Sequence, residues 1–385
     1  MEKGLFNRYA RRIEKIFAFL FCLFFIMQIF SPSINERTLY IEWGIMLVNP
    51  FFWQWLLPLR LTYRGMVIVL LLLFIIMLGH PTTAVKIFLN LYTAMSLMYI
   101  WQQKLWYING FILISIFVAL LQLITMSIDI ELARNIGPQK ISSFIWGAYA
   151  TQTNTNLYDA MGLGIPRAAG LSREAGFLAS LLVVIFTHRV IDIKSIKINK
   201  FTKIMYVLGY IASFSKMSLV LIPAYMIIKL RNYIDKIYAN FWLTIFLVLM
   251  LFYWHSHTEF LNEAANLTFL SRFGAYDTIW YLDFMQLMLG EGDLSKIGGI
   301  SAINEYYGEN LYAGLGGWIV SNGLLALLSF MVILWALNIN GTGVVLLMFL
   351  TINVQPDTNQ NFAAYAWFLC LHYFSNSGKY NGIKS

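Results

Sequence analysis

The chain has 385 residues, of which 59% are hydrophobic and only 12% are charged. Soluble proteins carry about 25% charged residues, so most of this chain must face lipid or other apolar segments. The same figures exclude a disordered chain, a disulfide scaffold and a coiled coil. In a membrane protein, the net charge of +8 indicates cytoplasmic loops rich in Lys and Arg rather than binding to nucleic acid.

Apolar runs recur along the whole chain, and a membrane helix needs about 20 mostly apolar residues. We therefore predict an all-α, polytopic membrane protein with about 12 transmembrane helices. Only Ser215 and Lys216 separate two of the runs, which predicts a tight helical hairpin there. The predicted spans are 16–30, 40–57, 65–79, 84–101, 109–127, 175–188, 202–214, 217–229, 238–254, 314–337, 343–354 and 362–374.

The charges fix an orientation for these spans. With both termini in the cytoplasm, 18 of the 27 basic residues and four of the 19 acidic residues lie inside, so the inside carries +14 and the outside −6. Lys and Arg concentrate on the cytoplasmic side of membrane proteins. The prediction is a single integral membrane domain, 1–385, in which 128–174 and 255–313 are two large external loops.

Nucleotide and metal motifs are absent from the sequence, which contains no GxxxxGK[ST], HExxH or CxxC. Cys22 and Cys370 stand in apolar runs and are interpreted as packing residues. We expect no cofactor and no metal. Since the longest predicted cytoplasmic loop is short, any energy source must come with the substrate or from an ion gradient.

The first external loop ends in charged residues at the start of a span. Arg167 precedes Arg173 and Glu174, and residues 173–177 are predicted to form the N-terminus of the next helix. Guanidinium groups bind phosphate oxygens bidentately, and a helix N-terminus adds free N–H groups. One interpretation is therefore an anion site. The other is an interfacial salt bridge that anchors the helix.

The second external loop combines aromatic residues with acids and one central arginine. It holds Arg272, Trp280, the Gly290–Gly292 segment and Glu309. Such a mixture suits a carbohydrate surface, because sugars stack on aromatic rings and hydrogen-bond to planar polar groups. The alternative is the aromatic belt that membrane proteins place at the interface.

Three segments together resemble bacterial O-antigen polymerases, which join lipid-linked oligosaccharide repeat units. The segment 172–177 resembles their Arg-Glu-Pro-Gly stretch, with Ala175 in place of proline. The segment 213–218 resembles the Ser-(Arg/Lys)-(Thr/Gly) motif between two spans. Arg272, Trp280 and Gly290-x-Gly292 resemble the Arg…Trp…Gly-x-Gly pattern of the second loop. The resemblance covers roughly residues 165–380.

The resemblance implies glycosyl transfer at the periplasmic side of the bacterial inner membrane. A growing glycan on undecaprenyl diphosphate would be the donor, and a lipid-linked repeat unit the acceptor. Arg167, Arg173, Lys216 and Arg272 would bind the diphosphate, and Glu174 or Glu309 would be the general base. A flippase and a chain-length regulator would be partners in the pathway. Each residue also has a structural interpretation: Glu174 as a partner of Arg173 or Lys216, Lys216 as a snorkelling lysine, and Glu309 as a solvated loop residue.

Two other functions stay open. An O-antigen ligase would pass the glycan to lipid A core, but Glu309-Asn310 stands where ligases usually have His-Asn. A transporter or flippase would show polar or broken helices near the bilayer midplane, whereas here the charges are predicted to gather in the outer loops. The polar segment 355–361 is interpreted as a simple hairpin turn.

Overall fold

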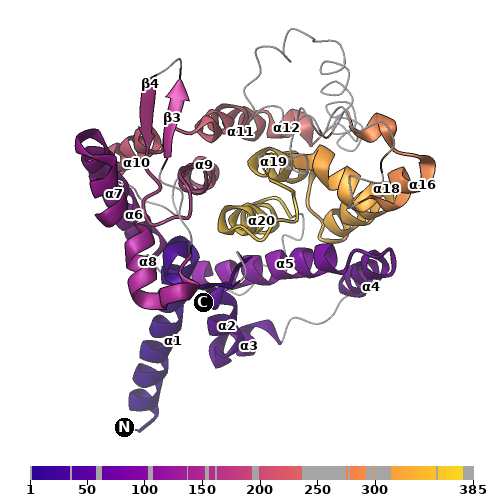
Figure 1. Cartoon of the computed structure of the whole chain (residues 1–385). Helices are drawn as coiled ribbons and strands as arrows, with labels where there is room; N and C mark the ends of the chain where they lie inside the picture. Colours follow the sequence, from indigo (N-terminus) through magenta and orange to yellow (C-terminus); the bar gives the residue numbers. More distant parts are fainter. Residues whose placement is uncertain are drawn as a thin grey trace. The chain divides into compact units, whose positions relative to one another are not determined.

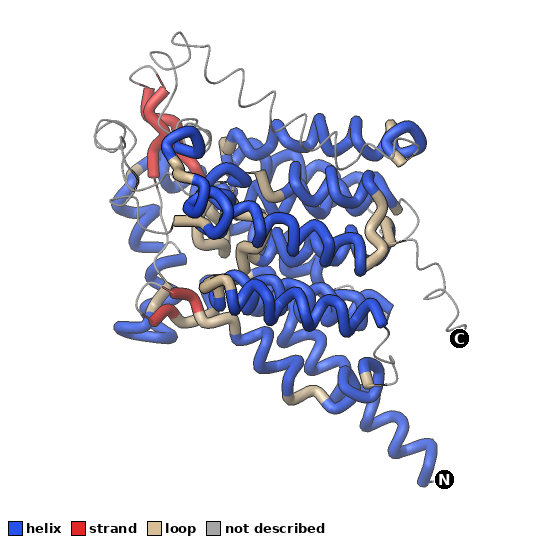
Figure 2. The backbone as a smooth tube through the Cα atoms, turned by 90° about the vertical axis from the view of Figure 1, so that its right-hand side faces the viewer, coloured by secondary structure: helices blue, strands red, loops and turns tan. Residues whose placement is uncertain are grey.

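Helix dominates the computed structural model of the chain, and the described strands form two short antiparallel hairpins (Figure 2). The predicted all-α class is therefore confirmed. Each predicted run in the described part contains helix, and the run 238–254 lies outside it. The structure describes residues 2–34, 37–57, 63–102, 107–136, 138–151, 156–160, 163–192, 199–235, 275, 278–291, 297, 314–352 and 354–375.

The chain forms two compact units. Unit 1 comprises residues 1–60 and 95–222. In this unit α6 packs against α1, α7 and α10, and α9 packs against α10 and η3 (Figure 1). Its elements are α1 (Glu2–Ile26), η1 (Gln28–Phe30), β1 (Ser33–Ile34), β2 (Arg37–Thr38), α2 (Ile41–Leu47), α3 (Pro50–Leu56), the second part of α5 (Pro81–Gln102), α6 (Tyr107–Ile128), α7 (Ile130–Ile136), α8 (Pro138–Trp146), η2 (Gly147–Tyr149), β3 (Asn156–Ala160), β4 (Leu163–Arg167), α9 (Ala175–Ile191), α10 (Lys200–Ser213) and η3 (Lys216–Val220).

Unit 2 comprises residues 61–94 and 223–385. In this unit α18 packs against α4 and α16, and α19 packs against α12 and α20. Its elements are α4 (Tyr63–Met77), the first part of α5, most of α11 (Leu221–Lys229), α12 (Arg231–Ile234), η4 (Ile279–Tyr281), α16 (Phe284–Leu289), α18 (Gly314–Ala336), α19 (Gly341–Leu350) and α20 (Asn361–Tyr373).

The predicted span 40–57 is not one helix. It consists of α2 and α3, each seven residues long, which meet at Asn49 and Pro50. The Asn49 side chain accepts hydrogen bonds from the backbone N–H groups of Phe51 and Phe52, and Pro50 occupies the first helical position. Asparagine at the N-cap and proline at the first position start a new helix. Each seven-residue helix is about 10 Å long, so neither α2 nor α3 alone is long enough to cross a bilayer.

Three helices in the described part, α5, α6 and α18, are long and apolar enough to cross a membrane. Along α6, Ile114, Phe117, Leu121 and Ile124 form an exposed apolar stripe. A helix needs such a face where it contacts lipid. The chain therefore carries helices of membrane-spanning character, while the number of spans, 12, stays a prediction.

The long helix α18 is broken within unit 2. Gly323 has a φ of 78°, and helical φ/ψ values are lost there. A Cβ atom at this residue would collide with the backbone of Met288, Leu289 and Gly290. Gly290, with a φ of 86°, would in turn bring a Cβ within 2.6 Å of the Ser321 backbone. Only glycine fits these two positions, because both need a left-handed conformation and a close backbone approach.

Candidate functional site

The segment 168–174, which leads into α9, is fixed by two buried polar side chains of α6. Gln122 Oε1 accepts a 2.8 Å hydrogen bond from the Gly170 backbone N–H, and Ser115 Oγ accepts a 3.0 Å bond from that of Leu171. Gly170 has a φ of 59°, and a Cβ on it would come within 2.8 Å of Ser115 Oγ. This arrangement satisfies buried backbone donors that an irregular segment otherwise leaves unpaired.

Two further hydrogen bonds tie the same segment to other parts of unit 1. The backbone N–H of Ala168 donates to the carbonyl of Ala212 in α10 at 2.9 Å, and the N–H of Ile29 donates to the carbonyl of Leu171 at 3.4 Å. Ala168, Leu171 and Ser172 are all nearly inaccessible to solvent. The backbone leading to Arg173 is therefore rigidly positioned before any ligand binds.

The charged residues emerge where this segment ends. Arg173 and Glu174 are half-buried, and α9 begins at Ala175, within the predicted range 173–177. Glu174 is the N-cap residue, and its side chain makes no capping hydrogen bond. The first backbone N–H groups of α9 and the Arg173 side chain thus lie together, as an anion site requires.

Arg173 lies near Tyr40, a residue distant in sequence. Burial raises the pKa of Tyr40, Glu42 raises it further, and Arg173 lowers it. Glu42 is only 1% exposed. Tyr40 precedes α2, and its ring stacks on Trp43 with centroids 4.6 Å apart. A cation, an acid and two aromatic rings therefore meet at the N-terminal end of α2.

An apolar groove of about 460 Å³ runs along α2 beside these residues. Tyr40 belongs both to its lining and to the surroundings of Arg173. Apolar clefts of this size hold part of a drug-sized or lipid molecule. The lining residues are Thr38, Leu39, Tyr40, Ile41, Trp43, Gly44, Ile45 and Val48.

The structure brings together two of the three segments that carry the family resemblance. Ala212 directly precedes the segment 213–218, and its carbonyl binds the segment that carries Arg173. The element η3, which begins at Lys216, packs against α9. Phe214 adopts a left-handed φ of 37°, which turns the chain sharply between α10 and η3. The chain therefore turns at the predicted position, and the packing of α10 against α11 that a helical hairpin requires stays a prediction.

The remaining predicted residues are distributed differently. Arg167 is half-buried at the end of β4, six positions before Arg173. The side chain of Lys216 lies outside the described part of the chain, as do Arg272 and Glu309. Gly290, from the third segment, packs against the broken part of α18 in unit 2. The structure thus places Arg173 and Glu174 at the start of α9 and Arg167 at the end of β4, and it does not describe the other three side chains.

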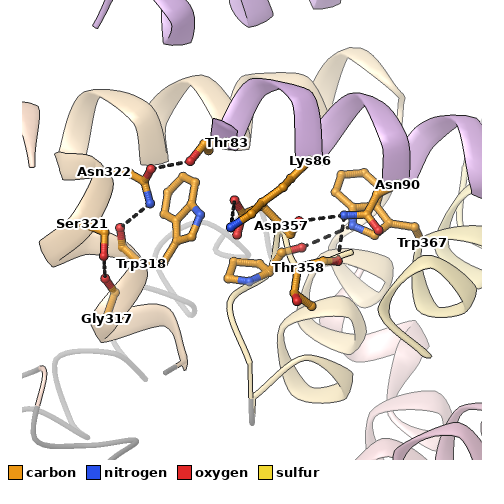
Figure 3. A network of polar contacts seen from close by, with 11 residues as sticks. Thr83, Lys86, Asn90, Gly317, Trp318, Ser321, Asn322, Asp357, Thr358 and Trp367 are labelled. Atoms are coloured by element: carbon orange, nitrogen blue, oxygen red, sulfur yellow. Dashed lines mark hydrogen bonds and ion pairs between the residues drawn. The ribbon is translucent and has the colours of Figure 1, made fainter. Parts of the chain in front are cut away.

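Unit 2 contains a buried polar cluster that the sequence did not predict (Figure 3). Lys86 Nζ lies 4.0 Å from Asp357 Oδ2, and the Asp357 side chain is fully buried. Asn90 Nδ2 donates to the backbone carbonyls of Asp357 at 2.9 Å and Thr358 at 3.0 Å. The segment 355–361 joins α19 and α20, which pack against each other, as a hairpin turn would, and it also carries a carboxylate into the protein interior.

The same cluster extends to the break in α18. Thr83 Oγ1 donates to Asn322 Oδ1 at 2.5 Å, and Asn322 Nδ2 donates to the carbonyl of Trp318 at 3.0 Å (Figure 3). Asn322 directly precedes Gly323. Lys86 lies inside the predicted span 84–101, so the expectation that the charges gather in the outer loops does not hold for this residue. A lysine inside the apolar run 84–101 was the available signal, since a charge in such a run needs a partner.

Comparison of the chain with protein-family models, with curated proteins and with solved structures gives no match.

Proposed function

We propose that the chain is a membrane glycosyltransferase that joins oligosaccharide repeat units carried on undecaprenyl diphosphate, at the periplasmic side of a bacterial inner membrane. The observation that carries the proposal is the position of Arg173. It stands at the N-terminus of α9, on a backbone fixed by Ser115 and Gln122, and beside the apolar groove along α2. A lipid diphosphate needs both features, a cationic site for the phosphates and an apolar surface for the lipid.

Arg173 would bind the diphosphate as it leaves the donor sugar. A guanidinium group offers two parallel N–H donors to phosphate oxygens, and the free N–H groups of α9 add to the positive potential. Arg167, Lys216 and Arg272 complete the proposed cationic site. Donors positioned in advance stabilise developing negative charge without reorganisation during the reaction.

Glu174 is the proposed base that the structure describes: it adjoins Arg173, and its side chain is not used as a helix cap. It would take the proton of the acceptor hydroxyl as that oxygen attacks the donor sugar. Glu309 stays an alternative base. The leaving diphosphate supplies the driving force, so the reaction consumes no nucleotide.

An extension assay tests this function directly. Purified full-length chain, reconstituted in liposomes with lipid-linked repeat units, should produce a ladder of longer lipid-linked glycans on a gel. Transfer of a preformed chain to lipid A core, with no ladder, would identify a ligase instead. Movement of the substrate across the bilayer without any extension would identify a transporter.

The transporter is a second candidate function, and it now has a specific observation in its favour. Transporters place binding sites at discontinuous helices with buried polar residues. Unit 2 has both features, in α18, which breaks at Gly323, and in the buried Asp357, which pairs with Lys86. The assay above separates the two candidates, because only the polymerase lengthens the glycan.

The proposed topology of 12 spans has its own test. Both native cysteines, Cys22 and Cys370, are fully buried, so they give little background with an impermeant thiol reagent. Ser143→Cys in α8 should react from outside in intact spheroplasts. Labelling only after lysis would place the first large loop in the cytoplasm and would contradict the proposed reaction as well.

A further inference from the structure

The turn between α19 and α20 places a carboxylate inside unit 2 with few partners. Asp357 is 0% exposed, and neither of its carboxylate oxygens has a hydrogen-bond partner among the described residues. Lys86 Nζ is 4.0 Å from Oδ2, which is an ion-pair contact without a hydrogen bond. The Lys86 side chain itself is 37% exposed, so the pair connects the buried carboxylate with the surface.

Residues of the turn and of its surroundings carry three other buried polar atoms without hydrogen-bond partners within the described part. They are Asn90 Oδ1 and Asn359 Oδ1, which are acceptors, and Trp318 Nε1, which is a donor. The Trp318 indole lies next to the Lys86 and Asp357 side chains (Figure 3), yet its N–H does not form a well-aligned hydrogen bond with the carboxylate. The backbone of the turn, by contrast, is held firmly by Asn90 Nδ2.

The chemistry of these atoms suits a protonated carboxyl better than an ionised one. A buried carboxylate accepts only, and it needs several donors to replace the water it has lost. A protonated carboxyl carries its own donor, so it needs fewer outside donors than the ionised form. Its carbonyl oxygen can accept from Trp318. A single ammonium group at 4.0 Å compensates an ionised form poorly.

We propose that Asp357 is a proton-binding site that exchanges with water at Lys86. On proton binding an O–H bond forms at one carboxylate oxygen, and the proton comes from water. Lys86 keeps its charge, loses its counter-ion and turns toward the solvent. The proposal does not depend on the glycosyl transfer proposed above.

The charges around the site agree with this proposal. Burial raises the pKa of Asp357, and the charge of Lys86 is the main influence that lowers it, followed by the donors on Trp318, the Asp357 backbone and Thr83. The groups on α18 and α20 that surround the turn, Trp318, Asn322 and Trp367, are neutral (Figure 3). Two further titratable groups lie on neighbouring elements. His80 Nε2 contacts the carbonyl of Leu289 at 2.5 Å, and Glu291 is joined to α18 by a backbone hydrogen bond to Val320.

Infrared spectroscopy of the full-length chain in liposomes tests the proposal. A protonated carboxyl has a C=O stretch that the ionised form lacks, and ordinary aspartates lose it with a pKa of about 3.9. Wild type should keep such a band above about pH 5 and lose it in a single titration. Asp357→Asn should lack the band. The control Asp129→Asn, which removes an exposed carboxylate in unit 1, should retain it.

Lys86→Met is the second test, because it removes the counter-ion of Asp357. Removing an opposite charge at this distance should move the titration of the band to higher pH by about 1–3 units. If the variants fail to fold, wild type carrying ¹³C-labelled aspartate carboxyl groups still decides the matter, because the band must then shift to lower frequency. An identical band in Asp357→Asn, an unchanged midpoint in Lys86→Met, or no isotope shift would overturn the proposal.

Discussion

The two units differ in the environment of a charged side chain that lies on a fixed backbone segment. In unit 1 the backbone that carries Arg173 is buried and hydrogen-bonded, and the guanidinium group stands at the edge, half-buried. In unit 2 the backbone of the turn is also fixed, by Asn90, but the charged group, Asp357, is itself buried. A charge presented at an edge can bind a ligand of opposite charge. A charge enclosed with few partners responds instead to protons and to its single counter-ion.

Glycine has the same structural role in both units, where it allows a close approach of two backbone segments. Gly170 lets the segment 168–174 approach Ser115 closely, and Gly290 and Gly323 let α16 and α18 approach each other. At all three positions the φ is positive and a side chain would meet backbone atoms. The units therefore differ in where the charge is placed and share the means by which irregular backbone is packed.

The largest effect is expected from Arg173→Ala. If Arg173 binds the leaving diphosphate, its loss should lower the rate by about 10²–10³-fold and reduce the glycan ladder to single-repeat products. Arg173→Lys keeps the charge and loses the bidentate geometry, so it should retain partial activity. The extension assay at matched protein levels provides the measurement.

Arg12→Ala is the matched control for Arg173, because Arg12 is exposed on α1 and distant in sequence from the proposed site. It should leave the ladder unchanged. A full ladder from Arg173→Ala would show that this arginine only anchors α9, since losing a surface salt bridge costs about 0–1 kcal/mol.

Gly170→Ala should destabilise unit 1 by at least about 2 kcal/mol, through a strained positive φ and overpacking against Ser115. Gly110→Ala is its control. Gly110 lies in α6 with open space around it, where alanine should stabilise the helix by about 1 kcal/mol. Thermal unfolding in detergent measures both. Equal melting temperatures for the two variants would contradict the close packing of the segment 168–174.

Asp357 should give unit 2 a pH dependence of stability with a definite sign. Because its pKa is raised in the folded state, the folded chain keeps a proton that the unfolded chain has released above about pH 3.9. The free energy of unfolding should therefore fall as the pH rises toward the folded-state pKa, by up to about 1.4 kcal/mol per pH unit.

Asp357→Asn should remove this fall, which pH series of thermal unfolding would reveal. The difference in the free energy of unfolding between wild type and Asp357→Asn should then be small at low pH and should grow as the pH rises. A parallel pair of curves would mean that Asp357 has an ordinary pKa in the folded chain.

The local features of the fold were predictable, and the tertiary ones were not. Apolar runs located the helices, and the charges before Ala175 predicted the start of α9. The break at Asn49 and Pro50 was readable as an N-cap followed by proline, although the continuous apolar run 40–57 concealed it. The hydrogen bond between Asn90 and the Asp357 carbonyl joins residues 267 positions apart, and no local pattern encodes such a contact.

In the candidate site, too, the sequence indicated the local features and did not indicate the tertiary contacts. Arg173 and Glu174 were singled out from a short motif, because their position before an apolar run has a direct electrostatic consequence. Tyr40, Glu42 and the groove along α2 were missed, because nothing in the sequence near residue 40 indicates that it lies beside Arg173.

The smallest expected effect comes from removing one hydroxyl group in each unit. Ser115→Ala deletes the acceptor of the Leu171 N–H, and Thr83→Val deletes the donor to Asn322. Each should cost about 1 kcal/mol of stability, so the two variants should have similar melting temperatures. Their activities should differ. The segment bound by Ser115 carries Arg173, and a displacement of that segment misplaces the guanidinium group. Ser115→Ala should therefore shorten the glycan ladder, while Thr83→Val leaves it at wild-type length. If both variants shorten the ladder equally at matched stability, the polar cluster of unit 2 takes part in the reaction and the division of roles between the two units is wrong.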